Sequence, residues 1–199
     1  EATAALNGVT ISGNKGCNGA EGVAIYADES TVTLNNCVVS DNDTDLYSES
    51  IIGAVDSKLI INNTDFTGNG AVSSTWDSDY SHLFYLEDSE LTMEGGKITG
   101  NNADKLFYFD DSEADIKGVT ITDNASIILD VDNSSAKVTL TECTLGNNEP
   151  IKKKVDVIVN TEGPLILNNC NLGDTTFEDK AMVAGIGSIF GEGSVTIII

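Results

Sequence analysis

The chain has 199 residues, with 32 acidic and 10 basic side chains and a formal net charge of −22. All ten basic residues are lysines, and so acidic a surface argues against binding nucleic acid or an anionic membrane. No apolar run approaches the ~20 residues of a membrane span, so direct membrane insertion is not expected.

In chain order, one thirteen-residue pattern keeps returning. It appears as STVTLNNCVVSDN (30–42), SKLIINNTDFTGN (57–69), SELTMEGGKITGN (89–101) and SEADIKGVTITDN (112–124). The pattern closes on an asparagine that recurs every 23 to 32 residues, at Asn14, Asn42, Asn69, Asn101, Asn124 and Asn148, with Thr175 in the equivalent place. A period in the twenties with strand-like composition predicts a solenoid. No stretch holds a 3.6-residue period, which excludes helical repeats.

Each repeat predicts three short strands. The first strand is apolar and ends in an acid, as in 24–28, 83–88, 106–111 and 127–132. The second strand alternates after a serine and should turn one pair inward in each repeat: Val32/Leu34, Leu59/Ile61, Leu91/Met93, Ala114/Ile116, Val138/Leu140, Leu165/Leu167 and Val195/Ile197. The third strand should do the same with Val9/Ile11, Cys37/Val39, Thr64/Phe66, Gly96/Ile98, Val119/Ile121, Cys143/Leu145 and Cys170/Leu172. Between the strands stand Asn, Gly, Asp and Ser, which tolerate tight turns and left-handed backbone.

Three strands and three corners in each repeat predict an all-β fold, a single-stranded parallel β-helix of about seven to eight coils. Residues of one kind then stack inside it in columns, one coil apart, at ~4.8 Å. Connections between parallel strands are right-handed as a strong rule, so a right-handed coil is expected. We interpret residues 1–199 as a single β-helix domain and as a segment of a larger surface protein.

The stretch GVAIYA…STVTLNNCVVSDN and the FTGN at 66–69 resemble the right-handed β-helix repeats of bacterial adhesin-like and polymorphic outer-membrane proteins. These belong to the pectate-lyase-like superfamily. The resemblance implies a secreted or cell-surface location and a non-catalytic role, either binding a glycan or a host or cell-surface protein or displaying binding loops. A polysaccharide lyase or glycoside hydrolase of the same fold is the alternative, and a purely structural spacer is a third.

The sequence offers little for catalysis. The pectate lyases use a basic residue, usually Arg, and this chain has none. The only histidine, His82, has no flanking glycine as in the hydrolase motif. Asp110 and Asp111 stand at a corner where most repeats carry acids, although stacked Glu87 and Asp110 could sit at the spacing of a glycosidase pair.

Candidate ligand-binding residues fall in two places. The insertion at 70–82 holds Trp76 and Tyr80, which could stack on a sugar, although Trp76 could equally cover a coil edge. Alternation turns two tyrosines of the first strands outward beside a column of acids, and this strip could contact carbohydrate or could only stiffen the sheet. The strip consists of Tyr85, Tyr108, Glu87, Asp110 and Asp132.

The one candidate metal site is the loop DNDTD, where Asp41, Asp43 and Asp45 could bind Ca²⁺ weakly. The twelve-residue loop lacks Gly at its sixth position and Glu at its twelfth, so it is not an EF-hand, and a solvated loop is the simpler interpretation. No other cofactor is expected.

The cysteines and the C-terminal residues complete the sequence-based expectations. Cys143 and Cys170 should occupy one interior column as free thiols, because two side chains pointing the same way rarely reach disulfide geometry. The second-strand pattern is still running at 193–199. The edge of that last coil, at 195–199, could therefore mediate self-association.

Overall fold

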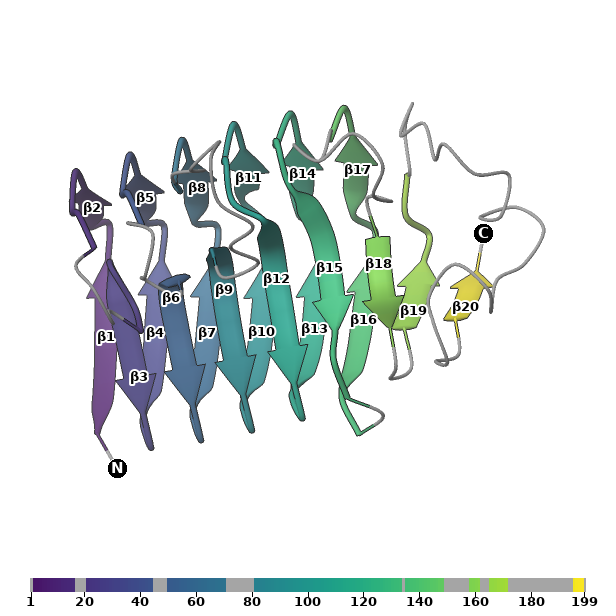
Figure 1. Cartoon of the computed structure of the whole chain (residues 1–199), viewed down its shortest axis with the longest axis horizontal. Coiled ribbons are helices and arrows are strands. Elements are labelled where there is room, and N and C mark those ends of the chain that lie inside the picture. Colours follow the sequence, from purple (N-terminus) through teal and green to yellow (C-terminus); the bar gives the residue numbers. More distant parts are fainter. Residues whose placement is uncertain are drawn as a thin grey trace.

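The computed structural model describes residues 2–16, 21–44, 50–70, 81–133, 135–148, 158–161, 165–171 and 195–198, the strands at 158–161 and 195–198 by their backbone alone. These residues form parallel strands that stack along one axis, with β1 (Thr3–Asn7) at one end and β20 (Val195–Ile198) at the other (Figure 1). The expected all-β parallel solenoid is confirmed. Among the described residues no helix is long and apolar enough to cross a membrane.

The strands form three sheets. The first sheet contains β1, β4 (Thr31–Asn35), β7 (Lys58–Asn62), β10 (Glu90–Glu94), β13 (Glu113–Lys117), β16 (Lys137–Thr141), β19 (Leu165–Asn168) and β20. The second contains β2 (Thr10–Ser12), β5 (Val38–Ser40), β8 (Asp65–Thr67), β11 (Lys97–Thr99), β14 (Thr120–Thr122) and β17 (Thr144–Gly146). The third contains β3 (Ile25–Asp28), β6 (Ser50–Val55), β9 (His82–Glu87), β12 (Lys105–Asp110), β15 (Ile127–Val131) and β18 (Ile158–Thr161).

Every strand pairs in parallel with the strand one coil away. In the first sheet, for example, Val32 pairs with Leu59 and Leu59 with Leu91. The described strands make six complete sets of three, and β19 and β20 extend the first sheet further. This is slightly fewer than the seven to eight coils expected from the sequence. Two first-type strands, β6 and β18, were not among those predicted. In β6, Gly53 interrupts the apolar run.

The core lies between the three sheets and consists of the predicted inward columns. In β4, β7, β10, β13, β16 and β19 the predicted pairs are at most 7% exposed. In the second sheet Val39, Phe66, Ile98, Ile121 and Leu145 are at most 1% exposed. Of the other predicted inward residues of this sheet, Ile11, Gly96 and Cys170 are half-buried, and Val9 is exposed, at 37%. It lies in the first coil, which has a neighbouring coil on one side only.

Each coil turns three corners, and a residue in the left-handed region stands at most of the described ones. One corner uses Glu29, Asp56, Asp88 and Asp111, with φ between 45° and 48°. The residue before each recurrent asparagine also has positive φ, at Gly13, Asp41, Gly68, Gly100, Asp123 and Asn147. Gly, Asn and Asp adopt this backbone at the least cost, which explains the composition of the turns.

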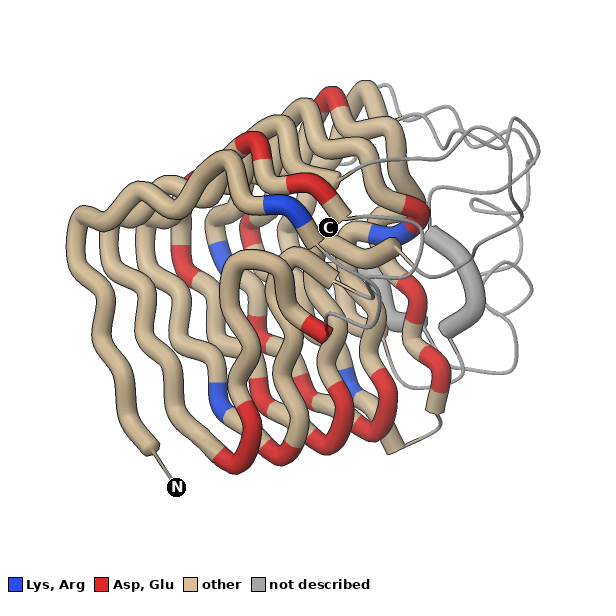
Figure 2. Tube along the Cα trace, turned by 60° about the vertical axis from the view of Figure 1, so that its left-hand side comes forward, with Lys and Arg blue, Asp and Glu red and all other residues tan. Residues whose placement is uncertain are grey.

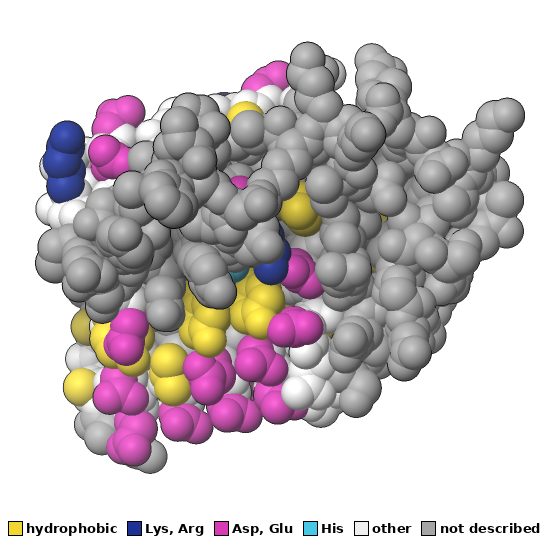
Figure 3. Space-filling model, viewed as in Figure 1, with side chains coloured by type: hydrophobic (Ala, Val, Ile, Leu, Met, Phe, Trp, Pro, Cys, Tyr) yellow, Lys and Arg dark blue, Asp and Glu magenta, His cyan; other side chains and the backbone are white. Residues whose placement is uncertain are grey.

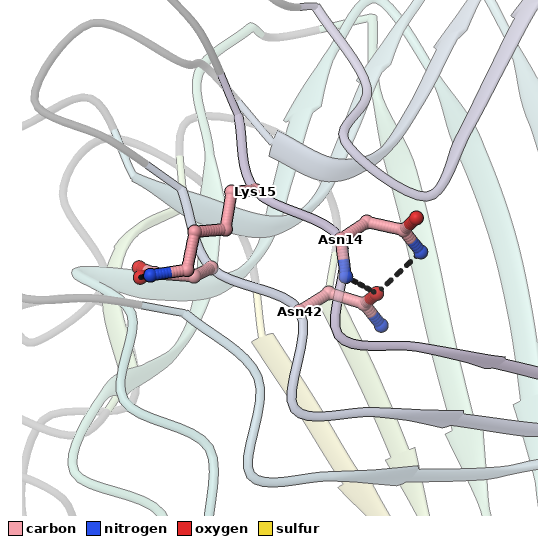
Figure 4. Close-up of polar contacts among 4 residues, drawn as sticks. Asn14, Lys15 and Asn42 are labelled. Atoms are coloured by element: carbon pink, nitrogen blue, oxygen red, sulfur yellow. Dashed lines mark hydrogen bonds and ion pairs between the residues drawn. The ribbon is translucent and has the colours of Figure 1, made fainter.

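The recurrent asparagines form a hydrogen-bonded ladder inside the coil. Asn42, Asn69, Asn101, Asn124 and Asn148 are at most 4% exposed. Each Oδ1 accepts the backbone N–H and the Nδ2–H of the asparagine one coil earlier, as Asn42 does from Asn14 at 3.1 and 2.8 Å (Figure 4). From Asn42 onward each Nδ2 also donates to a backbone carbonyl of the preceding coil, as Asn101 does to Phe66 at 3.0 Å. The ladder therefore satisfies buried backbone groups at a corner where strand pairing stops.

A second ladder uses the serines that precede β4, β7, β10 and β13. Ser57 accepts the backbone N–H of Ser30, and Ser89 accepts that of Ser57, at 2.9 and 3.0 Å. Three described cysteines, Cys37, Cys143 and Cys170, also occupy interior columns and are free thiols, as expected for Cys143 and Cys170. Burial raises the pKa of Cys143 to about 11, so this thiol stays protonated and packs as a small apolar residue. Cys17, residues 151–154, Thr175 and the segment 181–193 lie outside the described residues.

Candidate functional site

The outward face of the third sheet carries a group of aromatic and charged side chains that the core does not require. Tyr85 pairs in register with Tyr108, and Glu87 pairs with Asp110, so like residues stand in columns one coil apart. Asp132 continues the acidic column, and its N–H donates to the carbonyl of Phe109. The structure thus brings together five of the residues predicted from the sequence. Figure 3 shows the acids as a band along this face.

The first coil extends both columns. Tyr26 and Asp28 pair in register with Gly53 and Val55 of β6, which in turn pair with Tyr85 and Glu87. Tyr26 is 43% exposed, and a hydrogen bond with the Glu21 carboxylate raises its pKa to about 12. We call the whole set the tyrosine–acid strip, defined by Tyr26, Tyr85, Tyr108, Asp28, Glu87, Asp110 and Asp132.

The two tyrosines at the centre of the strip are held in place by their neighbours. The Tyr85 and Tyr108 rings stack with centroids 5.4 Å apart and planes at 12°. The Tyr108 hydroxyl donates to Oδ2 of Asp132 at 2.5 Å, and the Tyr85 hydroxyl donates to Oε2 of Glu87 at 3.0 Å. Burial, followed by this contact with Asp132, raises the pKa of Tyr108 far above its usual value. Both phenols are therefore oriented before any ligand arrives, and that of Tyr108 is neutral.

A buried cluster of charged and aromatic groups adjoins the strip. The Lys105 ammonium lies 2.5 Å from Oδ2 of Asp130, and these side chains are only 16% and 7% exposed. The same ammonium lies 4.6 Å from the centroid of the Tyr108 ring. Asp130 is the register partner of Tyr108 in the following coil, and Tyr85 is its partner in the preceding one. The His82 ring lies 5.0 Å from the Tyr108 ring.

Sequence alternation missed Lys105, Asp130 and Tyr26 as members of this region, and it considered His82 only as part of a catalytic motif. Phe107 and Phe109 face the core, so strict alternation along the strand would also turn Lys105, two residues before Phe107, toward the core. The strand instead buries two successive residues, Leu106 and Phe107, both 0% exposed. This irregularity places Lys105 on the same face as Tyr108.

The carboxylates of the acidic column lie close enough to repel one another. Burial raises the pKa of the Asp110 carboxyl, and the charges of Asp111, Asp132 and Glu87 raise it further, while a hydrogen bond from Asn133 acts in the opposite direction. A second acidic column lies at the adjoining corner, made of the left-handed residues Glu29, Asp56, Asp88 and Asp111. The first three of these line an open groove of about 660 Å³. Figure 2 shows the acids following one edge of the solenoid from coil to coil.

The remaining predicted residues do not join the strip. Trp76, Tyr80 and Asp45 lie outside the described residues, so their roles stay predictions. Asp41 lies exposed at a corner with φ of 53°, and Oδ2 of Asp43 lies 4.0 Å from the Lys15 ammonium. In the part of the chain that the structure describes, no group of three or more His, Cys, Asp or Glu residues is placed to hold a metal ion. The Ca²⁺ site remains a prediction.

Comparison with known proteins supports the fold. A protein-family model described as a right-handed beta helix region matches residues 2–179. No curated protein and no solved structure matches the chain. The matched region includes all of the coils from β1 to β19, and its description agrees with the parallel three-sheet solenoid and with the right-handed coil expected from the sequence. The chain therefore belongs to the right-handed β-helix family.

Proposed function

We propose that this chain is a non-catalytic β-helical segment of a secreted or cell-surface, adhesin-like protein, and that the tyrosine–acid strip binds a glycan. The observation that carries the proposal is the strip itself. Seven aromatic and acidic side chains project in columns from the outward face of a sheet whose packing does not need them. A rigid scaffold with adjacent aromatic and hydrogen-bonding groups is the usual composition of a binding surface.

The geometry indicates how the strip would contact a sugar. The carboxylates of Glu87, Asp110 and Asp132 accept hydrogen bonds, and their orientation along the column suits sugar hydroxyl donors. The Tyr108 ring is contacted both by the stacked Tyr85 ring and by the Lys105 ammonium. A sugar would therefore meet the edges of the central rings, and face-to-face stacking would be limited to the more exposed Tyr26.

A peptide that binds by adding a strand to the sheet does not fit this face. The central strands β6, β9 and β12 each pair with a neighbour on both sides. No free strand edge is therefore present at the centre of the strip, and an extended peptide could not add to the sheet there. Recognition has to come from side chains alone.

A glycoside hydrolase is the second candidate, favoured by one observation. Glu87 and Asp110 are register partners, and burial raises the pKa of Asp110. A carboxylic acid with a raised pKa beside an ionised carboxylate is the arrangement of a glycosidase acid and its partner. Release of reducing sugar from neutral and acidic glycans, abolished by Asp110→Asn, would favour this candidate over the non-catalytic one.

A glycan array tests the proposed binding. The double variant Glu87→Gln/Asp110→Asn should lose binding, because it removes two charged acceptors at the centre of the strip. The control is Glu113→Gln/Asp115→Asn, which makes the same change of charge on outward positions of β13 in the first sheet. Absence of any glycan bound by the wild-type chain, or equal loss in both double variants, would refute the proposal.

A further inference from the structure

The carboxylates of the tyrosine–acid strip have no cationic partner in the described part of the chain. The ion pairs found there join Lys15 to Asp43, Lys58 to Glu90 and Lys105 to Asp130. None of them involves Asp28, Glu87, Asp110 or Asp132. The second acidic column at the adjoining corner adds further negative charge within one or two residues of the strip.

The same face already binds one ammonium group, and it does so with the groups that the strip repeats. The Lys105 ammonium is held by the Asp130 carboxylate at 2.5 Å and lies 4.6 Å from the Tyr108 ring centroid. A carboxylate combined with an aromatic ring is a favourable environment for a primary ammonium. The strip offers Glu87 and Asp110 beside the same tyrosines, and these carboxylates are more exposed than that of Asp130 and make no ion pair in the described part of the chain.

We infer that the tyrosine–acid strip takes a glycan whose sugar units carry protonated amino groups, such as glucosamine, and that it excludes uronic acid polymers. This inference rests on the proposed function and names the class of its ligand. Each ammonium would lie between carboxylates of successive coils, which stand ~4.8 Å apart. The sugar hydroxyls would donate to the remaining carboxylate oxygens.

Electrostatics decides between the glycan classes. A positive ligand relieves the mutual repulsion of the acidic column, which adds to burial in raising the pKa of Asp110. A uronate would place further negative charge beside Glu87, Asp110 and Asp132, and the net charge of −22 would oppose its approach. An N-acetylated sugar would keep the hydroxyl contacts and lose the ionic ones.

Calorimetric titration at two salt concentrations tests the inference with four probes. These are a glucosamine oligosaccharide, its N-acetylated counterpart, an oligogalacturonate of the same length, and a lysine peptide of equal charge. The glucosamine oligosaccharide should bind about tenfold or more tightly than the N-acetylated one, because only it makes charge-assisted hydrogen bonds. Its affinity should fall with added salt and with Glu87→Gln/Asp110→Asn, and it should persist in Glu113→Gln/Asp115→Asn.

Other results of the titration would contradict either the inferred ligand class or the proposed glycan binding, and the two cases can be told apart. Equal or tighter binding of the N-acetylated sugar or of the oligogalacturonate overturns the inference and leaves glycan binding in place. Tighter binding of the lysine peptide, or equal loss of glucosamine binding in the two double variants, also overturns it, because the attraction would then be to a basic protein or to net charge. Binding of no glycan, on the array or in the titration, overturns the proposed function itself.

Discussion

Removing one amide from the interior ladder tests how the coils are held together. Asn101 is 1% exposed, and its Oδ1 accepts the N–H and the Nδ2–H of Asn69 at 2.9 and 3.0 Å. Its Nδ2 donates to the carbonyl of Phe66 and to Oδ1 of Asn124, both at 3.0 Å. Asn101→Ala would leave two buried donors of Asn69 and one buried carbonyl without their partner.

The expected loss of stability is large. Each buried polar group that loses its hydrogen-bond partner costs about 1–3 kcal/mol, so three of them cost about 3–6 kcal/mol once partial relaxation is allowed for. That is a substantial part of the total of about 5–15 kcal/mol typical of folded proteins. Urea unfolding followed by far-ultraviolet circular dichroism measures the change directly.

Asn35→Ala is the matched control, because the chemical change is the same on the outer surface. Asn35 donates to Asn7 and accepts from Asn62, both at 2.8 Å, at partly exposed positions. Water replaces these partners, so the expected cost is less than about 1 kcal/mol. Equal free energies of unfolding for the two variants would refute the claim that the interior ladder stabilises the coils.

Four further outcomes follow from the structure. Ile98→Asp should cost about 4 kcal/mol or more, because it buries an unpaired charge at a position that is 0% exposed. Ile60→Asp, on the outward face of β7, should cost far less, and thermal melts of the two variants compare them. Gly53→Ala should lower the melting temperature, since its Cβ would lie 2.3 Å from a backbone oxygen. Burial and then its carboxylate contact raise the pKa of Tyr108, so the stability it contributes is present below about pH 10 and is lost as the pH rises further. Tyr108→Phe should flatten that alkaline loss in unfolding titrations. The Cys143 thiol, with a pKa of about 11, should stay unmodified by a disulfide reagent at neutral pH until the chain unfolds, as peptide mapping would show.

Most of the fold could be predicted because the core repeats its chemistry. Leu59, Leu91 and Val138 recur at one position of the pattern, and their alternation with polar residues identifies the inward face of the first sheet. The strand β6 could not be predicted in the same way. Its residues at 50–54 are all buried, so inward and outward positions do not alternate along them. Gly53 within this stretch is a residue typical of turns.

The recurrent asparagines show the limit of pattern reading at the corners. Their period was plain from the sequence, but their inward direction was not. Asn42 follows Asp41, whose left-handed backbone breaks the alternation set by Cys37 and Val39. The amide therefore enters the interior from a corner, which composition alone would assign to solvent.

The candidate site could be predicted only in part, for a related reason. Tyr85, Tyr108, Glu87 and Asp110 follow from simple alternation along two strands. Lys105 depends on the pair of successive buried residues before Tyr108, which changes the face of the strand. Lys105 and Asp130 contact each other although they lie one coil apart. The sequence shows which residues lie on neighbouring coils, but it does not show how closely their side chains approach.

Mapping the bound sugar onto the molecule tests the central claim most directly. The chain has five tyrosines, so fluorotyrosine labelling gives a ¹⁹F spectrum with few signals, assigned from single Tyr→Phe variants. During titration with a glucosamine oligosaccharide, the Tyr85 and Tyr108 signals should shift together and saturate at one ligand concentration. Signals of Tyr85 and Tyr108 that stay in place while the ligand binds would contradict the account, because the binding surface would then lie elsewhere on the solenoid.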